Sequence, residues 1–136
     1  MSAQTRRLQR RLEAIPKAVK SAVHPALIQS GNEIAGTMKT LAPVDTGALR
    51  DSIEVTAPGT ASPPYSQPGG SRLAAENEVL ITVGNEDVRY PHLVEYGTQN
   101  SSAQPFFWPA FRLLRKKASN RIKRAVSKAV KTEWVK

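Results

Sequence analysis

The sequence contains no cysteine, so the chain forms no disulfide bond and has no thiol for catalysis or metal binding. Histidine is scarce too, and neither His24 nor His92 has partners at the spacing of a metal site. No hydrophobic run approaches the roughly 18 residues of a membrane span, and the N-terminus lacks the apolar core of a signal peptide. We therefore expect no metal, no cofactor and no membrane contact, and a cytoplasmic site of synthesis and assembly.

Catalytic arrangements are also missing. The serines lack a nucleophile-elbow sequence, and the glycines do not follow the spacing of a phosphate-binding loop. No carboxylate lies in an obviously apolar context that would suit a general acid or base; this holds for Asp45, Asp51, Glu86, Asp87 and Glu95. The sequence therefore predicts a protein that is not an enzyme. A hydrolase acting through Asp45 or Glu95 is the remote alternative.

Acidic residues are outnumbered, which gives a net charge of +9 and a pI near 10.3. Residues 1–20 hold six basic residues against Glu13, and residues 112–136 hold ten against Glu133. Between residues 31 and 97 the balance reverses, with nine acidic residues and four basic ones. Such an imbalance is typical of proteins with a polyanionic partner. Two basic ends around an acidic middle suit a protein that contacts both a polyanion and other protein subunits.

Hydrophobic periodicity predicts helices at both ends of the chain. Residues 5–41 carry an apolar stripe from Leu8 to Leu41, interrupted by Pro16 and Pro25. We expect a short basic helix, then a longer one over about residues 17–40, with a kink or break at Pro25. A last helix has Pro109 in its first turn and runs to about residue 132. Its predicted stripe comprises Phe111, Leu114, Ala118, Ile122, Ala125 and Ala129.

The middle of the chain predicts a small sheet. Residues 52–56 and 78–84 have the composition of strands, and residues 89–96 suit a strand or a single helical turn ending at Gly97. Residues 57–75 are a long loop, rich in proline and glycine, in which Pro63-Pro64-Tyr65 favours an extended arm with one aromatic anchor. The predicted class is α+β: one domain over residues 1–136, with helical residues 1–41, sheet and loops 42–104, and a C-terminal helix 105–136.

Two segments have alternative interpretations. The aromatic segment 105–111 either anchors the last helix on the sheet or forms a subunit contact, because aromatic residues are enriched in interface cores. The basic last helix is either a solvated surface or a phosphate-binding one, and such binding would be independent of base sequence and weakened by salt. No recognition helix, finger or base-stacking platform accompanies it.

Three ordered motifs resemble a phage morphogenesis family. They are Leu41-Ala-Pro-Val-Asp-Thr-Gly-Ala-Leu-Arg-Asp-Ser-Ile53, then Val83-Gly84 with Tyr90-Pro-His-Leu-Val-Glu-Tyr-Gly-Thr98, then Ala103-Gln-Pro-Phe-Phe-Trp-Pro-Ala-Phe111. The family takes its name from the tenth gene product of a lambda-like coliphage and is similar in role to the lambda tail-completion protein Z. The likeness spans about residues 10–130.

The resemblance implies a structural protein of the neck or tail of long-tailed, siphovirus-like phages, which completes the tail and joins it to the head. It implies a ring, hexameric, located in the virion and assembled in the host cytoplasm. The expected partners are further copies, the tail terminator, tail tube or head connector proteins, and packaged DNA through phosphate contacts. The alternative is a basic protein that binds nucleic acid without sequence preference.

The resemblance also suggests where contacts lie. The expected subunit or partner interface comprises Pro43, Asp45, Thr46, Gly47, Pro63, Pro64, Tyr65, Glu95, Tyr96, Gly97, Phe106, Phe107 and Trp108. The expected contact with DNA or an acidic partner comprises Arg115, Lys116, Lys117, Arg121, Lys123, Arg124 and Lys128.

Overall fold

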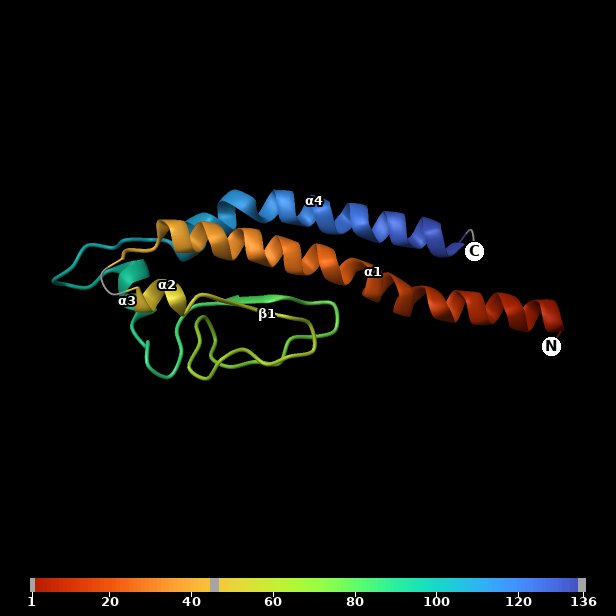
Figure 1. Ribbon diagram of the computed structural model, residues 1–136, viewed down its shortest axis with the longest axis horizontal. Helices are drawn as coiled ribbons and strands as arrows, with labels where there is room; N and C mark the ends of the chain where they lie inside the picture. Colours follow the sequence, from red (N-terminus) through yellow and green to blue (C-terminus); the bar gives the residue numbers. More distant parts are fainter. Residues whose placement is uncertain (1, 45–46, 135–136) are drawn as a thin grey trace.

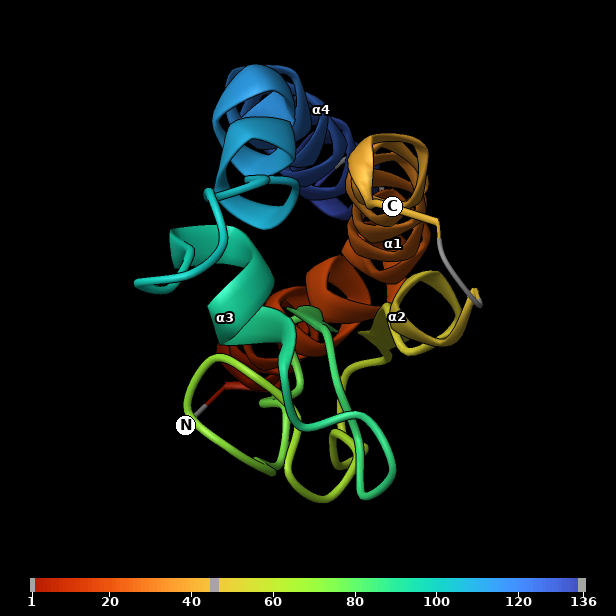
Figure 2. The same ribbon diagram turned by 90° about the vertical axis from the view of Figure 1, so that its left-hand side faces the viewer.

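Two long antiparallel helices dominate the computed structural model, which describes residues 2–44 and 47–134 (Figure 1). The elements are α1 (Ala3–Leu41), α2 (Ala48–Asp51), β1 (Glu54–Thr56), β2 (Leu80–Thr82), α3 (Pro91–Tyr96) and α4 (Phe107–Trp134). The sheet, α2, α3 and the loops pack on one half of this helical hairpin, and both chain ends lie at the other half (Figures 1 and 2). The α+β prediction is confirmed. Asp45 and Thr46 lie outside the described residues.

The N-terminal helix is continuous over 39 residues, about 58 Å of rise, so the prediction of two helices is wrong. Pro16 and Pro25 both lie inside it, and each removes one intrahelical hydrogen bond. Figure 2 shows the first turns leaning away from the axis of the later ones, so the helix bends without ending. The turns on the C-terminal side are held by burial of their apolar stripe, which outweighs the cost of the prolines.

The core lies where α1 and α4 meet above the sheet. Met38 and Phe106 are fully buried, and Ile34, Phe107 and Ala110 pack with them. The stripe of α4 follows the prediction through Leu114 and Ala118 to the buried Ala129. Phe111 does not follow it, because its side chain stays exposed beside Trp108, with ring centroids 6.1 Å apart.

A charged cluster joins the two helices further along. The Arg121 guanidinium donates to both oxygens of Glu33, at 2.7 and 2.9 Å, and to Oγ of Ser30 at 3.2 Å. The ammonium of Lys117 lies 3.9 Å from the same carboxylate. The hydrogen bonds from Arg121, together with the positive charges of Arg121 and Lys117, hold the pKa of Glu33 below its ordinary value despite partial burial. This cluster fixes the register of α4 along α1.

The strands are shorter than predicted. They pair antiparallel over three residues each, Glu54 opposite Thr82 and Thr56 opposite Leu80. Ser52, expected in the first strand, instead ends the turn of α2: its Oγ donates to the Leu49 carbonyl at 2.6 Å and accepts from the Gly84 N–H at 3.0 Å. Gly84 has φ of 94°, and a Cβ there would lie 2.8 Å from the Val88 carbonyl oxygen. The buried serine therefore closes the end of the sheet.

The loop over residues 57–75 is irregular as predicted, but its expected extended arm is wrong. Pro63 to Ser66 form a turn closed by the Ser66 N–H on the Pro63 carbonyl at 3.2 Å. Ser62 and Ser66 are buried, and the Ser62 Oγ accepts from the Arg72 N–H at 2.9 Å. Tyr65 has a φ of 62°. The Arg89 guanidinium covers the Tyr65 ring, with its Cζ 3.8 Å from the ring centroid. Serine hydroxyls thus satisfy the backbone of a loop folded onto its own sheet.

The Glu33 carboxylate should make stability depend on pH. Its folded pKa is lowered, so its contribution is present above the ordinary value of 4.5 and is lost as the pH falls through the lowered value. Glu33→Gln should therefore lower the melting temperature at pH 7, and the difference should shrink as the pH falls below 4.5. Thermal unfolding across this range checks it, with exposed Glu54→Gln as the control. A constant difference between Glu33→Gln and the unmodified chain would contradict the assignment.

Candidate subunit interface

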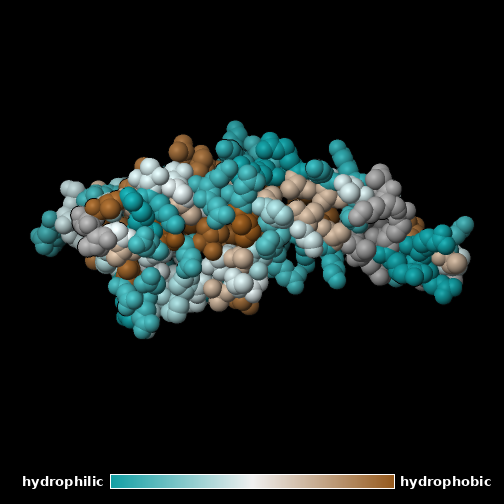
Figure 3. All heavy atoms as spheres, in the orientation of Figure 1, coloured by the Kyte–Doolittle hydropathy of each residue, from teal (hydrophilic) through white to brown (hydrophobic). Residues whose placement is uncertain are grey.

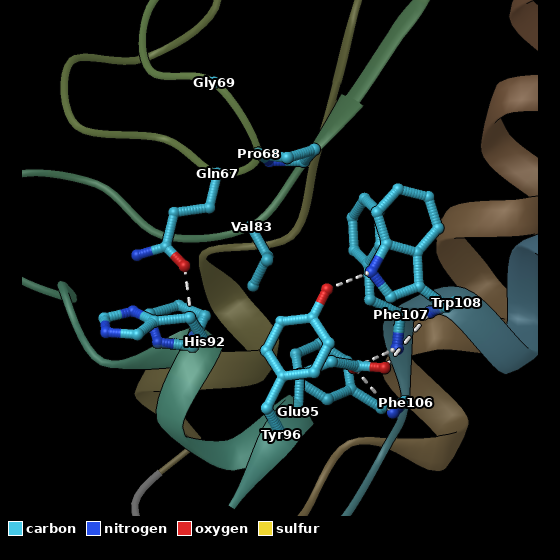
Figure 4. A pocket seen from close by; sticks show the side chains of 11 residues that line it. Gln67, Pro68, Gly69, Val83, His92, Glu95, Tyr96, Phe106, Phe107 and Trp108 are labelled. Carbon is cyan, nitrogen blue, oxygen red and sulfur yellow. Dashed lines mark hydrogen bonds between the residues drawn. The ribbon is translucent and has the colours of Figure 1, made fainter.

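The second and third motifs meet at the start of α4. The buried carboxylate of Glu95, in α3, accepts from the N–H groups of Phe106 at 3.0 Å, Phe107 at 2.9 Å and Trp108 at 3.4 Å (Figure 4). These N–H groups have no partner within the helix, and the positive end of the helix dipole favours the carboxylate. Glu95 therefore caps α4 from another element. The sequence does not predict this cap, because the N–H groups that bind Glu95 lie 11 to 13 residues further along the chain and come close to it only through folding.

Gly97 makes the return from α3 to α4 possible. It ends α3 with φ of 77°, and a Cβ there would lie 2.7 Å from the Ala103 nitrogen. The Gln104 N–H then donates to the Val94 carbonyl at 2.8 Å, which closes the loop over residues 98–103. The glutamate and glycine of the second motif thus position the aromatic residues of the third.

A pocket of about 260 Å³ opens beside this junction (Figure 4). Its walls come from the proline-rich loop, the end of β2, α3 and the start of α4, and include Pro68, Val83, His92, Tyr96 and Trp108. The Trp108 indole N–H donates to the Tyr96 hydroxyl at 2.8 Å, while the Tyr96 side chain is 69% exposed. The pocket is mostly apolar with an aromatic rim, which suits an apolar side chain of another protein.

The other expected interface residues lie elsewhere. Pro43 and Gly47 line a second groove of about 330 Å³ between α2 and α3, together with Leu49, Tyr90 and Leu93. Pro63, Pro64 and Tyr65 lie on the folded loop, outside both hollows. Phe106 and Phe107 line the first pocket but are buried, and they pack in the core where α4 begins. The accessible aromatic residues at the junction are Tyr96 and, in part, Trp108.

The cations of α4 divide into two groups. Lys117 and Arg121 face Glu33 on α1, and the Arg121 side chain is only 17% exposed. The others in the expected set are exposed along the outer face of the helix, where Figure 3 shows hydrophilic side chains; they are Arg115, Lys116, Lys123, Arg124 and Lys128. This second group has the geometry to meet an anionic surface.

The described residues contain neither a metal-binding cluster nor a membrane-spanning helix. Within residues 2–44 and 47–134, no cluster of three or more histidine or acidic side chains could hold a metal ion. In the same part of the chain, no helix is both long and apolar enough to cross a bilayer. His92 reaches the first pocket, where its backbone N–H donates to the Gln67 amide oxygen at 3.0 Å.

Removing the Glu95 cap should destabilise the fold. Glu95→Ala leaves two buried N–H groups and one partly buried N–H group unsatisfied, and should cost about 2–3 kcal/mol. Glu95→Gln retains one acceptor oxygen and should cost about 1 kcal/mol. Urea unfolding measures both, with exposed Glu86→Ala as the control. A Glu95→Ala variant as stable as the control would show that the cap contributes nothing.

Comparison with known proteins identifies the chain. A family model described as "Bacteriophage HK97-gp10, putative tail-component" matches residues 6–97, which hold nearly all of α1, then α2, the sheet and α3, with the first motif and the second as far as Gly97. Neither the curated proteins nor the solved structures gave a match. Because the matched span exceeds half of the 136 residues, the chain belongs to the HK97-gp10-like family of bacteriophage tail components.

Proposed function

We propose that this tail component completes the phage tail and joins it to the head, as a non-enzymatic ring in the neck of the virion. The observation that carries the proposal is the family match, together with the exposed aromatic pocket to which the second motif contributes. The ring would be hexameric and would contact the tail terminator, the tail tube or the head connector. Its assembly would take place in the host cytoplasm.

The pocket at the α3–α4 junction is the proposed contact with a neighbouring tail or neck protein. Its aromatic rim is held in place because Glu95 ties α3 to the start of α4. Pre-positioned aromatic side chains lose little conformational freedom on binding, which favours affinity. Tyr96 is the proposed anchor residue, since its ring is mostly exposed while its hydroxyl is fixed by Trp108.

The exposed cations of α4 support a second contact, with packaged DNA or an acidic partner protein. They also support the alternative function of a basic nucleic-acid-binding protein, whose contacts would be phosphate contacts. The two functions differ in location, since a tail component is recovered in purified particles and a nucleic-acid-binding protein with cellular DNA or RNA.

Truncating the proposed anchor should block assembly while sparing the fold. Tyr96→Ala removes a ring that is 69% exposed, so stability should change by less than about 1 kcal/mol. Phages carrying it should yield at least about tenfold fewer infectious particles, with heads and tails accumulating separately in electron micrographs. Leu113→Ala is the matched control, because Leu113 is equally exposed on α4 but lies outside the pocket. Normal titres for Tyr96→Ala would remove the pocket from the proposal.

Neutralising the outer face of α4 should impair head–tail joining and leave folding intact. The variant replaces Arg115, Lys116, Lys123 and Arg124 with glutamine, and Lys39→Gln is the control on an exposed lysine of α1. Infectious titre and melting temperature are measured together. A duplex-binding assay at two salt concentrations separates phosphate contact, which salt weakens strongly, from contact with an acidic protein. Normal particles with all four charges removed would contradict the role of this face.

A further inference from the structure

The first turns of α1 project beyond the rest of the molecule. Ser30 and Glu33 lie beside Arg121, and the two helices are antiparallel, so the end of α4 reaches only to about residue 17 of α1 (Figure 1). The turns before it extend alone for about 20 Å. Their exposed side chains include Arg6, Arg7 and Arg10, and Leu8 is 49% exposed. Among the described residues, α4 does not extend over these turns, which present a basic helical surface with an exposed apolar side chain.

A groove with the complementary properties lies at the opposite end of the molecule. The hollow of about 330 Å³ between α2 and α3 has Leu49 and Leu93 in its walls. Acidic residues stand close in the sequence to residues that line the groove. Asp51 comes two residues after Leu49 in α2, and Glu86 and Asp87 come shortly before Tyr90. The hydrogen bond between Gly84 and Ser52 holds these two acidic stretches together. The groove is lined by polar as well as apolar residues, among them Ser101 and Gln104, and exposed carboxylates stand close to its lining residues in the sequence.

Ion pairing within the chain leaves these carboxylates available. Glu33 pairs with Arg121, Glu76 with Lys20, and Glu78 with Arg72. Among the described residues, the acidic residues next to the groove form no ion pair. The bases nearest the groove in the chain are Arg50, which is half-buried, and Arg89, whose guanidinium covers Tyr65 and donates to the Glu86 carbonyl at 3.0 Å. Lys39 is exposed in the last turn of α1.

We propose that the projecting turns of α1 dock into the α2–α3 groove of a second copy of this chain. Leu8 enters the groove, and the arginines around it meet the carboxylates of its border, as an amphipathic helix binds a groove. Because the two surfaces lie at opposite ends, the contact is heterologous and repeats from copy to copy, closing into a ring if the rotation permits. This inference rests on the proposed ring and names the surfaces that build it.

Cysteine cross-linking tests where the copies touch, because the unmodified chain has no cysteine. Leu8→Cys/Leu93→Cys places thiols at opposite ends of one molecule, so a disulfide between them forms only between copies. Under mild oxidation the expected result is a ladder of covalent multimers, in solution and in purified particles. Leu8→Cys/Leu113→Cys is the control and should give no ladder, since Leu113 is exposed on α4 away from the groove. Equal ladders, or a ladder from neither variant, would overturn the docking.

Charge exchange tests the chemistry of the same contact. Arg7→Glu/Arg10→Glu and Glu86→Lys/Asp87→Lys should each weaken self-association at least tenfold by light scattering. Mixing them should restore it, because each supplies the charge that the other has lost. Lys39→Glu/Arg112→Glu changes the net charge by as much as the first variant and should associate normally. Melting temperatures confirm that each variant folds.

The outcomes separate this inference from the proposed function. Variants that associate like the unmodified chain, or a mixture that stays dissociated, would overturn the docking. A chain that binds duplex DNA through Arg7 and Arg10 and stays monomeric would overturn it as well. If the unmodified chain is nevertheless found in purified tails, the role in the tail stands without this contact. Its absence from particles would refute the proposed function itself.

Discussion

The carboxylate of Glu95 is the constraint on which the arrangement of the molecule depends. Its bonds to the first N–H groups of α4 fix where that helix begins and which way it points. Once α4 starts there, Phe106 and Phe107 fall into the core against α1, and Arg121 comes level with Glu33. The register of the hairpin thus follows from one cap and one ion pair. The projection of α1 beyond α4 is then a consequence of their lengths.

The motifs that mark the family are mainly features of the fold. Ser52 and Gly84 close the sheet, while Glu95 and Gly97 turn the chain into α4. Each has a backbone or packing requirement that another residue would not meet. The side chains left at the surface, Tyr96 among them, are those able to contact a partner. A motif of this kind therefore identifies the fold, whereas the residues that contact a partner have to be sought among the exposed side chains.

The sequence predicted the class of fold because periodicity reports which face of a helix is buried. It predicted two helices at the N-terminus wrongly: at Pro25 the cost of the proline is local, while the burial of Val23, Ala26 and Leu27 on either side opposes a break. It predicted an extended arm wrongly, because the serines that fold the loop act through contacts across it. The cap at Glu95 joins residues more than ten positions apart, and no local sequence pattern predicts such a contact.

Charge has two separate roles in this chain, and only the structure distinguishes them. Lys117 and Arg121 have the same sequence signature as their exposed neighbours on α4, yet they face inward and hold the helices together. The remaining exposed charges include cations on the projecting turns and on α4, and carboxylates on the loops and on α2. Copies carrying +9 repel one another as whole bodies, so association favours orientations that bring opposite ends together. An uneven charge can therefore direct assembly where the total charge opposes it.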